Sequence, residues 1–95
     1  RSPFDQLAEI VDAVGDKVDV ICEGGIRRGT HVLKALSVGA KACSGGRMYL
    51  YALAAGGQKG VEKSLNNLKL EIERDMKLMG ITSIDQLSRK SIKFR

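Results

Sequence analysis

The sequence predicts an α/β fold, and three observations support that prediction. Stretches with helical periodicity alternate with two short apolar runs, over residues 17–22 and 41–44. The first run is nearly continuous in apolar character, as in a strand that is covered on both faces. Each run leads into paired glycines with an arginine close behind. Because the connections are short, we expect a βαβ unit with two parallel strands and a right-handed crossover.

The first predicted helix spans residues 3–14. Ser2 offers a hydroxyl N-cap, and Pro3 suits the first helical position. Gly15 follows as the residue that ends the helix. Apolar residues recur with helical spacing and predict one buried stripe, formed by Leu7, Ile10, Val11 and Val14.

The helix between the two strands is predicted to start with Thr30 as its cap and to stop at Gly39. Residues 23–29 are expected as the loop that leaves the first strand, and residues 45–47 as the loop that leaves the second.

Two further helices are predicted after the second strand, over residues 48–55 and 59–79, with a break at Gly56-Gly57. The longer one has a single apolar face and ends at Gly80. Residues 83–86 match a capping box and predict a last short helix to about Lys90. The apolar face consists of Val61, Leu65, Leu68, Ile72, Met76 and Met79.

This order of elements is that of the last quarter of a (β/α)8 TIM barrel. Two strands alone do not make a stable open sheet, and a complete barrel takes about 250 residues. We therefore expect residues 1–95 to be a partial barrel domain. It would contain the end of helix 6, strand 7, helix 7, strand 8, helix 8 and a C-terminal helix.

Composition excludes several classes of function. Aromatic residues make up 4% of the chain, so nothing supports stacking of nucleobases and no nucleic-acid partner is expected. The only histidine is His31 and there is no Cys-x-x-Cys pair, so no metal site is expected. No run is long enough to be a transmembrane segment. Cys22 and Cys43 are expected as reduced, buried strand residues, which favours a cytoplasmic location.

The net charge of +5 is concentrated toward the C-terminus. Four of the last seven residues are basic, and they predict a solvated tail. The alternative is contact with an acidic partner or peripheral association with a membrane surface. The four residues are Arg89, Lys90, Lys93 and Arg95.

The two glycine-arginine passages predict one phosphate-binding site. Paired glycines let the backbone approach a ligand closely, and free N–H groups there can point at an anion. Arg27 and Arg47 would add donors that match phosphate. Both passages would lie at the carboxyl ends of parallel strands, where α/β folds place ligands. The alternative is that these arginines are surface residues at strand ends.

The run Glu-Gly-Gly-Ile-Arg-Arg-Gly-Thr-His-Val-Leu-Lys-Ala-Leu-Ser-Val-Gly-Ala-Lys-Ala, residues 23–42, resembles the strand-seven region of the FMN-dependent α-hydroxy acid oxidase and dehydrogenase family. Glycolate oxidase and the FMN-linked L-lactate dehydrogenases belong to that family. Gly46-Arg47, the run Tyr49–Gly57 with Gly60-Val61, and the helix end Met76–Ile81 also resemble the family pattern. The resemblance covers essentially the whole chain.

The resemblance implies an FMN cofactor and a full-length enzyme that oxidises a small 2-hydroxy acid, such as L-lactate or glycolate, to the 2-oxo acid. It implies cofactor contacts from Glu23, Gly24, Gly25, Arg27, Gly46 and Arg47. Glu23 stands where the family usually has Asp, and His31 stands where Asp is more common. The family's histidine base lies upstream, so no catalytic residue is expected among these 95 residues.

Alone, the chain is expected to be inactive, to bind flavin weakly or not at all, and to self-associate as a homo-oligomer. The alternative reading is a non-catalytic phosphate-binding or structural module that self-associates to cover its open strand edges.

Overall fold

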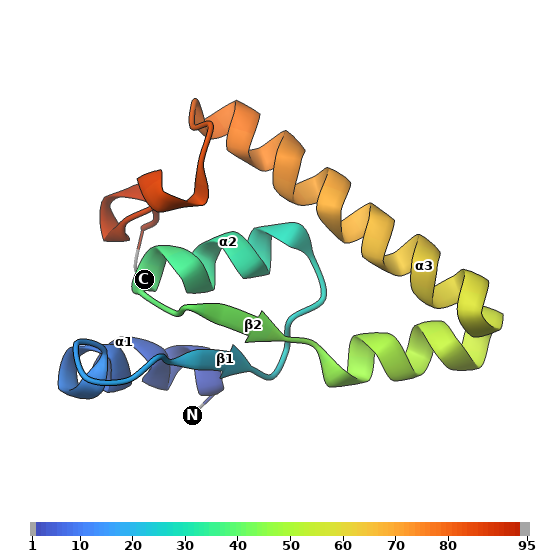
Figure 1. Cartoon of the computed structure of the whole chain (residues 1–95), viewed down its shortest axis with the longest axis horizontal. Helices are drawn as coiled ribbons and strands as arrows, with labels where there is room; N and C mark the ends of the chain where they lie inside the picture. The colour runs from blue at the N-terminus through green and yellow to red at the C-terminus, as the bar shows by residue number, and fades with distance from the viewer. Residues whose placement is uncertain (1, 94–95) are drawn as a thin grey trace.

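The computed structural model describes residues 2–93. Three helices and two strands follow one another as α1 (Pro3–Val14), β1 (Ile21–Glu23), α2 (Gly29–Val38), β2 (Ala42–Ser44) and α3 (Gly46–Met79). Two single-turn 3₁₀ helices follow α3 within the described residues, Ile84–Gln86 and Arg89–Ser91. The predicted α/β order is confirmed (Figure 1).

The two strands pair in parallel, as the short connections predict. Ile21 lies opposite Ala42, Cys22 opposite Cys43, and Glu23 opposite Ser44. The first strand is shorter than predicted: residues 17–20 are not part of it, although the Lys41 N–H still donates to the Val20 carbonyl at 2.7 Å. A strand continues only where a neighbouring strand forms hydrogen bonds with its backbone N–H and C=O groups. Within the described residues β2 is the neighbour of β1, and the two pair over three residues.

Helices α1 and α2 cover one face of this small sheet. Buried residues from α1, β1, α2 and the turn after α2 form the core there, and the partly buried Cys43 of β2 packs against them. The buried residues are Leu7, Cys22, Ala35, Val38 and Ala40. The expectation that the first strand is covered on both faces is wrong for the described chain, because Ile21 on the opposite face is 62% exposed. Side chains alternate along a strand, so Cys22 points to the core and its neighbours point away.

The predicted break at Gly56-Gly57 is confirmed as a sharp bend within α3. Gly57 has φ 61° and ψ −147°, which lie outside the helical region. A residue with a β-carbon rarely adopts these angles. The first part of α3 projects beyond the carboxyl ends of the strands, and the second part returns alongside α2 (Figure 1). The apolar face of the second part is only partly covered, since Leu65 and Met79 remain exposed.

The C-terminal segment differs from its prediction in two ways. The capping box exists, because the Ser83 hydroxyl accepts from the Asp85 N–H and Gln86 accepts from the Ser83 N–H. However, the predicted helix to Lys90 is replaced by the two 3₁₀ turns. The prediction of a merely solvated tail is also wrong at Arg89, which donates to the Val38 carbonyl at 3.3 Å and to Asp12 Oδ1 at 2.8 Å. Arg95 lies outside the described residues.

Candidate functional site

A cleft of about 600 Å³ lies at the carboxyl ends of β1 and β2. The start of α1 and the start of α3 complete its walls. Five of the six predicted site residues line it: Glu23, Gly24, Gly25, Arg27 and Arg47. The sixth, Gly46, lies beside the cleft, and a β-carbon added to it would sit 3.9 Å from Glu23 Oε1. The fold therefore brings the two glycine-arginine passages together.

The turn after β1 depends on its glycines. Gly24 and Gly25 have φ angles of 110° and 74°, which side-chain-bearing residues rarely adopt. A β-carbon on Gly24 would come within 2.8 Å of Pro3 Cγ, whereas a β-carbon on Gly25 would meet nothing within 4 Å. The backbone is thus packed on one side at Gly24 and open at Gly25, so a ligand has room to approach it.

The start of α3 supplies backbone donors to the same cleft. The prediction that residues 45–47 form a loop is wrong, because Gly46 and Arg47 already belong to the first turn of α3. The N-cap residue, Gly45, has no side chain to bond the first N–H groups of the helix. Unsatisfied N–H groups and the positive end of the helix dipole favour an anion there. TIM barrels commonly build a phosphate site from the last two strand-end loops and the start of a short extra helix.

The charges around the cleft suit a phosphate attached to a polar chain. Arg27 and Arg47 are exposed cations that follow the neighbouring carboxyl ends of β1 and β2. The carboxylate of Glu23 cannot bind phosphate favourably, but it accepts hydrogen bonds from hydroxyl groups. Met48 and Tyr51 add an apolar wall. The residues present therefore fit the phosphate and polyol part of a flavin mononucleotide.

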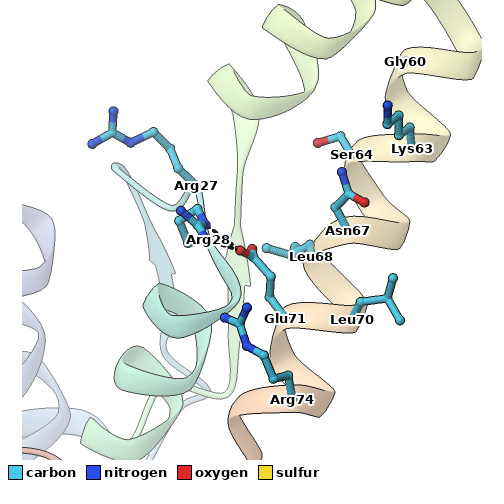
Figure 2. Close-up of a pocket in the computed structure, with 10 residues that line it drawn as sticks. All are labelled: Arg27, Arg28, Gly60, Lys63, Ser64, Asn67, Leu68, Leu70, Glu71 and Arg74. Carbon is cyan, nitrogen blue, oxygen red and sulfur yellow. Dashed lines mark hydrogen bonds and ion pairs between the residues drawn. The ribbon is translucent and has the colours of Figure 1, made fainter.

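The two adjacent arginines point in different directions. Figure 2 shows the Arg27 side chain directed away from the second part of α3 and the Arg28 side chain directed toward it. The Arg28 guanidinium forms an ion pair with Glu71 on the second part of α3, and the Gly29 N–H donates to Glu71 Oε1 at 3.1 Å. These bonds lower the pKa of Glu71. Arg28 is thus engaged in joining α2 to α3, outside the cleft.

A second bond joins the same two helices. The prediction that Thr30 caps α2 is wrong, because Thr30 lies within the helix. Its hydroxyl donates to Asp75 Oδ2 at 2.7 Å, and this bond lowers the pKa of Asp75. Sequence reasoning missed both Glu71 and Asp75. Their i, i+4 spacing places them on one face of α3, but the spacing does not say which partner that face meets. Beside this junction lies an outer pocket of about 710 Å³, lined in part by Lys63, Asn67 and Arg74 (Figure 2).

His31 lies in the first turn of α2 and is half-buried. Its Nδ1 accepts hydrogen bonds from the backbone N–H groups of Arg27 and Arg28, at 3.1 and 3.2 Å. It is not among the residues that line the cleft.

The two cysteines face each other in register across the strands and are free thiols. Burial, with a smaller contribution from Cys22, raises the pKa of the Cys43 thiol to about 11. Burial followed by the nearby Glu23 carboxylate raises the pKa of Cys22. Protonated thiols are poor nucleophiles, so both cysteines serve as packing residues here.

Within residues 2–93, no cluster of three potential metal ligands is present. In the same range, none of the helices has the length and hydropathy that a membrane span requires.

Comparison with known proteins places this arrangement in a family. The sequence profile of the family described as FMN-dependent dehydrogenase matches residues 1–94. A cytochrome-type L-lactate dehydrogenase of Wickerhamomyces anomalus is 44% identical over 93 residues, covering 93% of this chain and 16% of that protein. A peroxisomal (S)-2-hydroxyacid oxidase of Arabidopsis thaliana is 45% identical over 87 residues, covering 92% of this chain and 24% of that protein.

Solved structures give the same answer. The flavin-binding domain of baker's yeast flavocytochrome b2 superposes with a TM-score of 0.83 at 46% identity, covering 95% of this chain and 24% of that one. A soluble mutant of (S)-mandelate dehydrogenase from Pseudomonas putida superposes with a TM-score of 0.90 at 38% identity, covering 98% of this chain and 26% of that one. The chain thus spans about a sixth to a quarter of the proteins it matches, and it has the α/β fold of that part of TIM-barrel flavoenzymes. The chain belongs to the FMN-dependent dehydrogenase family.

Proposed function

We propose that this chain is the FMN-phosphate-binding part of an oxidoreductase that converts a small 2-hydroxy acid to the 2-oxo acid. The proposal rests on the cleft that joins the ends of β1 and β2, in which Arg27 and Arg47 lie among glycine backbone and the uncapped start of α3. The names of the relatives, which act on L-lactate and other (S)-2-hydroxy acids, supply the substrate class. In barrel terms, β1 and β2 would be strands seven and eight.

Different residues of the cleft would bind different parts of the cofactor. Arg27, Arg47 and the first N–H groups of α3 would hold the phosphate. Glu23 would accept hydrogen bonds from the hydroxyls of the cofactor's polar chain, and Gly24 and Gly25 would let it approach the backbone. When bound, FMN supplies the acceptor for the hydride equivalent that leaves the substrate carbon. These residues therefore anchor and orient, and they form no bond with the substrate.

The proton that leaves the substrate needs a base, and the described residues do not supply one at the cleft. His31 is unsuitable, because its Nδ1 is occupied by two backbone N–H groups and its ring lies away from the cleft lining. We place the base in a part of the enzyme that precedes these residues in the complete barrel. The chain alone would then have no turnover.

The proposal is tested on the full-length protein. It should purify with bound flavin, and L-lactate or glycolate should bleach the flavin spectrum in the absence of oxygen. A 3-hydroxy acid of similar size is the matched control and should leave the spectrum unchanged. Protein that contains no flavin and takes up none when FMN is added would overturn the proposal. Bound flavin that no 2-hydroxy acid reduces would overturn the substrate class alone.

A second candidate, a self-associating module, is favoured by one observation. Large apolar side chains are exposed on the open face of the sheet and on both parts of α3, among them Ile21, Leu50 and Leu78. Exposed apolar surface of this kind marks an interaction site. Sedimentation of the chain alone separates this candidate from a stable monomer, and flavin content separates it from the enzyme.

A further inference from the structure

We propose that His31 is a positioning residue for the phosphate-binding turn, holding the backbone of Arg27 and Arg28 so that the Arg27 side chain faces the cleft. This inference rests on the proposed FMN site. It concerns a residue that would touch neither cofactor nor substrate and would act through the turn alone.

The geometry of the bonds carries the inference. Nδ1 of His31 accepts from two consecutive backbone N–H groups, at 3.1 Å from Arg27 N and 3.2 Å from Arg28 N. The turn that these residues end begins with two glycines at positive φ, so its backbone has few intrinsic restraints. Two bonds to one rigid ring therefore fix the point where the flexible turn becomes helix.

The two arginines show why fixing this point matters. Arg28 is held at the second part of α3 by Glu71, while the Arg27 side chain points the other way (Figure 2). Arg27 lines both the cleft and the outer pocket, so it stands at the boundary between them. A small rotation of the backbone between the two arginines would redirect both side chains together. His31 and Glu71 hold this junction from two sides, since Glu71 also accepts from the next backbone N–H, that of Gly29.

The hydrogen bonds define the protonation state that is needed. A nitrogen that accepts carries no proton, so the proton of the neutral ring sits on Nε2. Burial lowers the pKa of His31, and the cations Lys34, Arg27 and Arg28 lower it further, against an opposing effect of Glu71. Ring protonation would place a third N–H donor against the two backbone donors and break both bonds.

The experiment compares FMN with riboflavin, which lacks the phosphate, on full-length wild type and three variants. His31→Ala should weaken FMN binding about tenfold, the equivalent of roughly one net hydrogen bond. Its affinity for riboflavin should equal that of wild type. His31→Asn, whose amide oxygen can accept the same two bonds and does not titrate, should restore FMN binding. Lys34→Ala, one turn along α2, is the control and should match wild type above pH 7, where the His31 ring is neutral.

The pH profile supplies a second readout. Above pH 7, wild type and His31→Asn should bind FMN equally. As the pH falls through the pKa of His31, the affinity of wild type should fall faster than that of His31→Asn. Titration of the cofactor phosphate affects both proteins equally, so it cancels in the ratio of their FMN dissociation constants. The protection factors of the Arg27 and Arg28 backbone amides, which are their exchange rates relative to the unprotected rate at the same pH, should fall over the same range in wild type only, when measured without cofactor.

Three results would overturn the inference. One is equal FMN binding by wild type and His31→Ala. Another is equal loss of FMN and riboflavin, which indicates general unfolding. The third is tighter FMN binding by wild type than by His31→Asn at low pH, which would mean that the imidazolium simply attracts phosphate. Failure of the FMN site itself is separate, because it would appear as unchanged FMN binding in Arg27→Ala and Arg47→Ala.

Discussion

Glu71 accepts a hydrogen bond from the backbone N–H of Gly29, a residue 42 positions earlier in the chain. The first turn of α2 is therefore satisfied by a carboxylate from another helix, which also pairs with the Arg28 guanidinium. A carboxylate at a helix N-terminus is stabilised by the helix dipole. The junction between α2 and α3 thus supports the turn that carries Arg27.

Substitution of Gly29 should weaken this junction. An added β-carbon would come within 2.7 Å of Glu71 Cβ and of Ile72 N. Overpacking of this kind costs about 1–3 kcal/mol, so Gly29→Ala should lower the free energy of unfolding by that amount. Gly56→Ala is the matched control, since a β-carbon there meets nothing within 4 Å. Denaturant titration measures both variants, and equal stability of the two would contradict the packing argument.

The ion pair at the junction should lose its effect in acid. The folded-state pKa of Glu71 lies below its unfolded value because of its bonds to Arg28 and Gly29. Its contribution is therefore complete above the unfolded pKa of about 4.3 and is lost as the pH falls through the folded value. The melting temperature should be higher for wild type than for Glu71→Gln at pH 7, and this difference should disappear as the pH falls through the lowered pKa of Glu71. The exposed Glu73→Gln controls for removal of a charge; a gap that persisted in acid would refute the assignment.

Arg89 should anchor the C-terminal segment. Its bond to the Val38 carbonyl and its partly exposed pair with Asp12 together should contribute about 1 kcal/mol. Arg89→Ala should lower the free energy of unfolding by that amount and speed amide exchange at Ile92, which packs against the core. Asp12→Ala removes only the exposed pair and should have less than half the effect. An Arg89→Ala protein with unchanged exchange at Ile92 would show that the segment is held by apolar packing alone.

The cysteines should react slowly with alkylating reagents. Burial raises the pKa of Cys43 to about 11, and each unit of pKa reduces the reactive thiolate tenfold. Alkylation of Cys43 at pH 8 should therefore be about 100-fold slower in the folded protein than in urea. Peptide mass mapping over time measures the rate. Rapid labelling of Cys43 in the folded protein would contradict the protonated, packed state.

Much of the fold could be predicted from local signals. Ser2 and Pro3 define the start of α1, where the Ser2 hydroxyl accepts from the Asp5 N–H at 3.1 Å. The glycine pair at 56–57 indicates the bend in α3. Such features depend on residues close in sequence, so periodicity and capping rules find them.

The errors arise where distant partners decide the structure. Thr30 looks like a helix cap, yet Asp75 takes its hydroxyl and Glu71 satisfies the helix start instead. The valines at 18 and 20 suggest that the strand starts before Ile21, but within the described residues no neighbouring strand pairs with residues 17–20 over most of that length. The positions of Arg27 and Arg47 could be predicted because both follow strands whose ends meet. The role of His31 in the turn could not, because its bonds depend on the ring orientation.

The central claim is that the two glycine-arginine passages hold one phosphate. The direct measurement is the ratio of riboflavin to FMN dissociation constants for full-length wild type, Arg27→Ala, Arg47→Ala and the double variant, with the exposed Lys69→Ala as control. Each single variant should reduce the ratio by roughly 10- to 100-fold, the size of one charge-assisted hydrogen bond. The double variant should bring it close to one. Ratios that match wild type in both single variants would contradict the account.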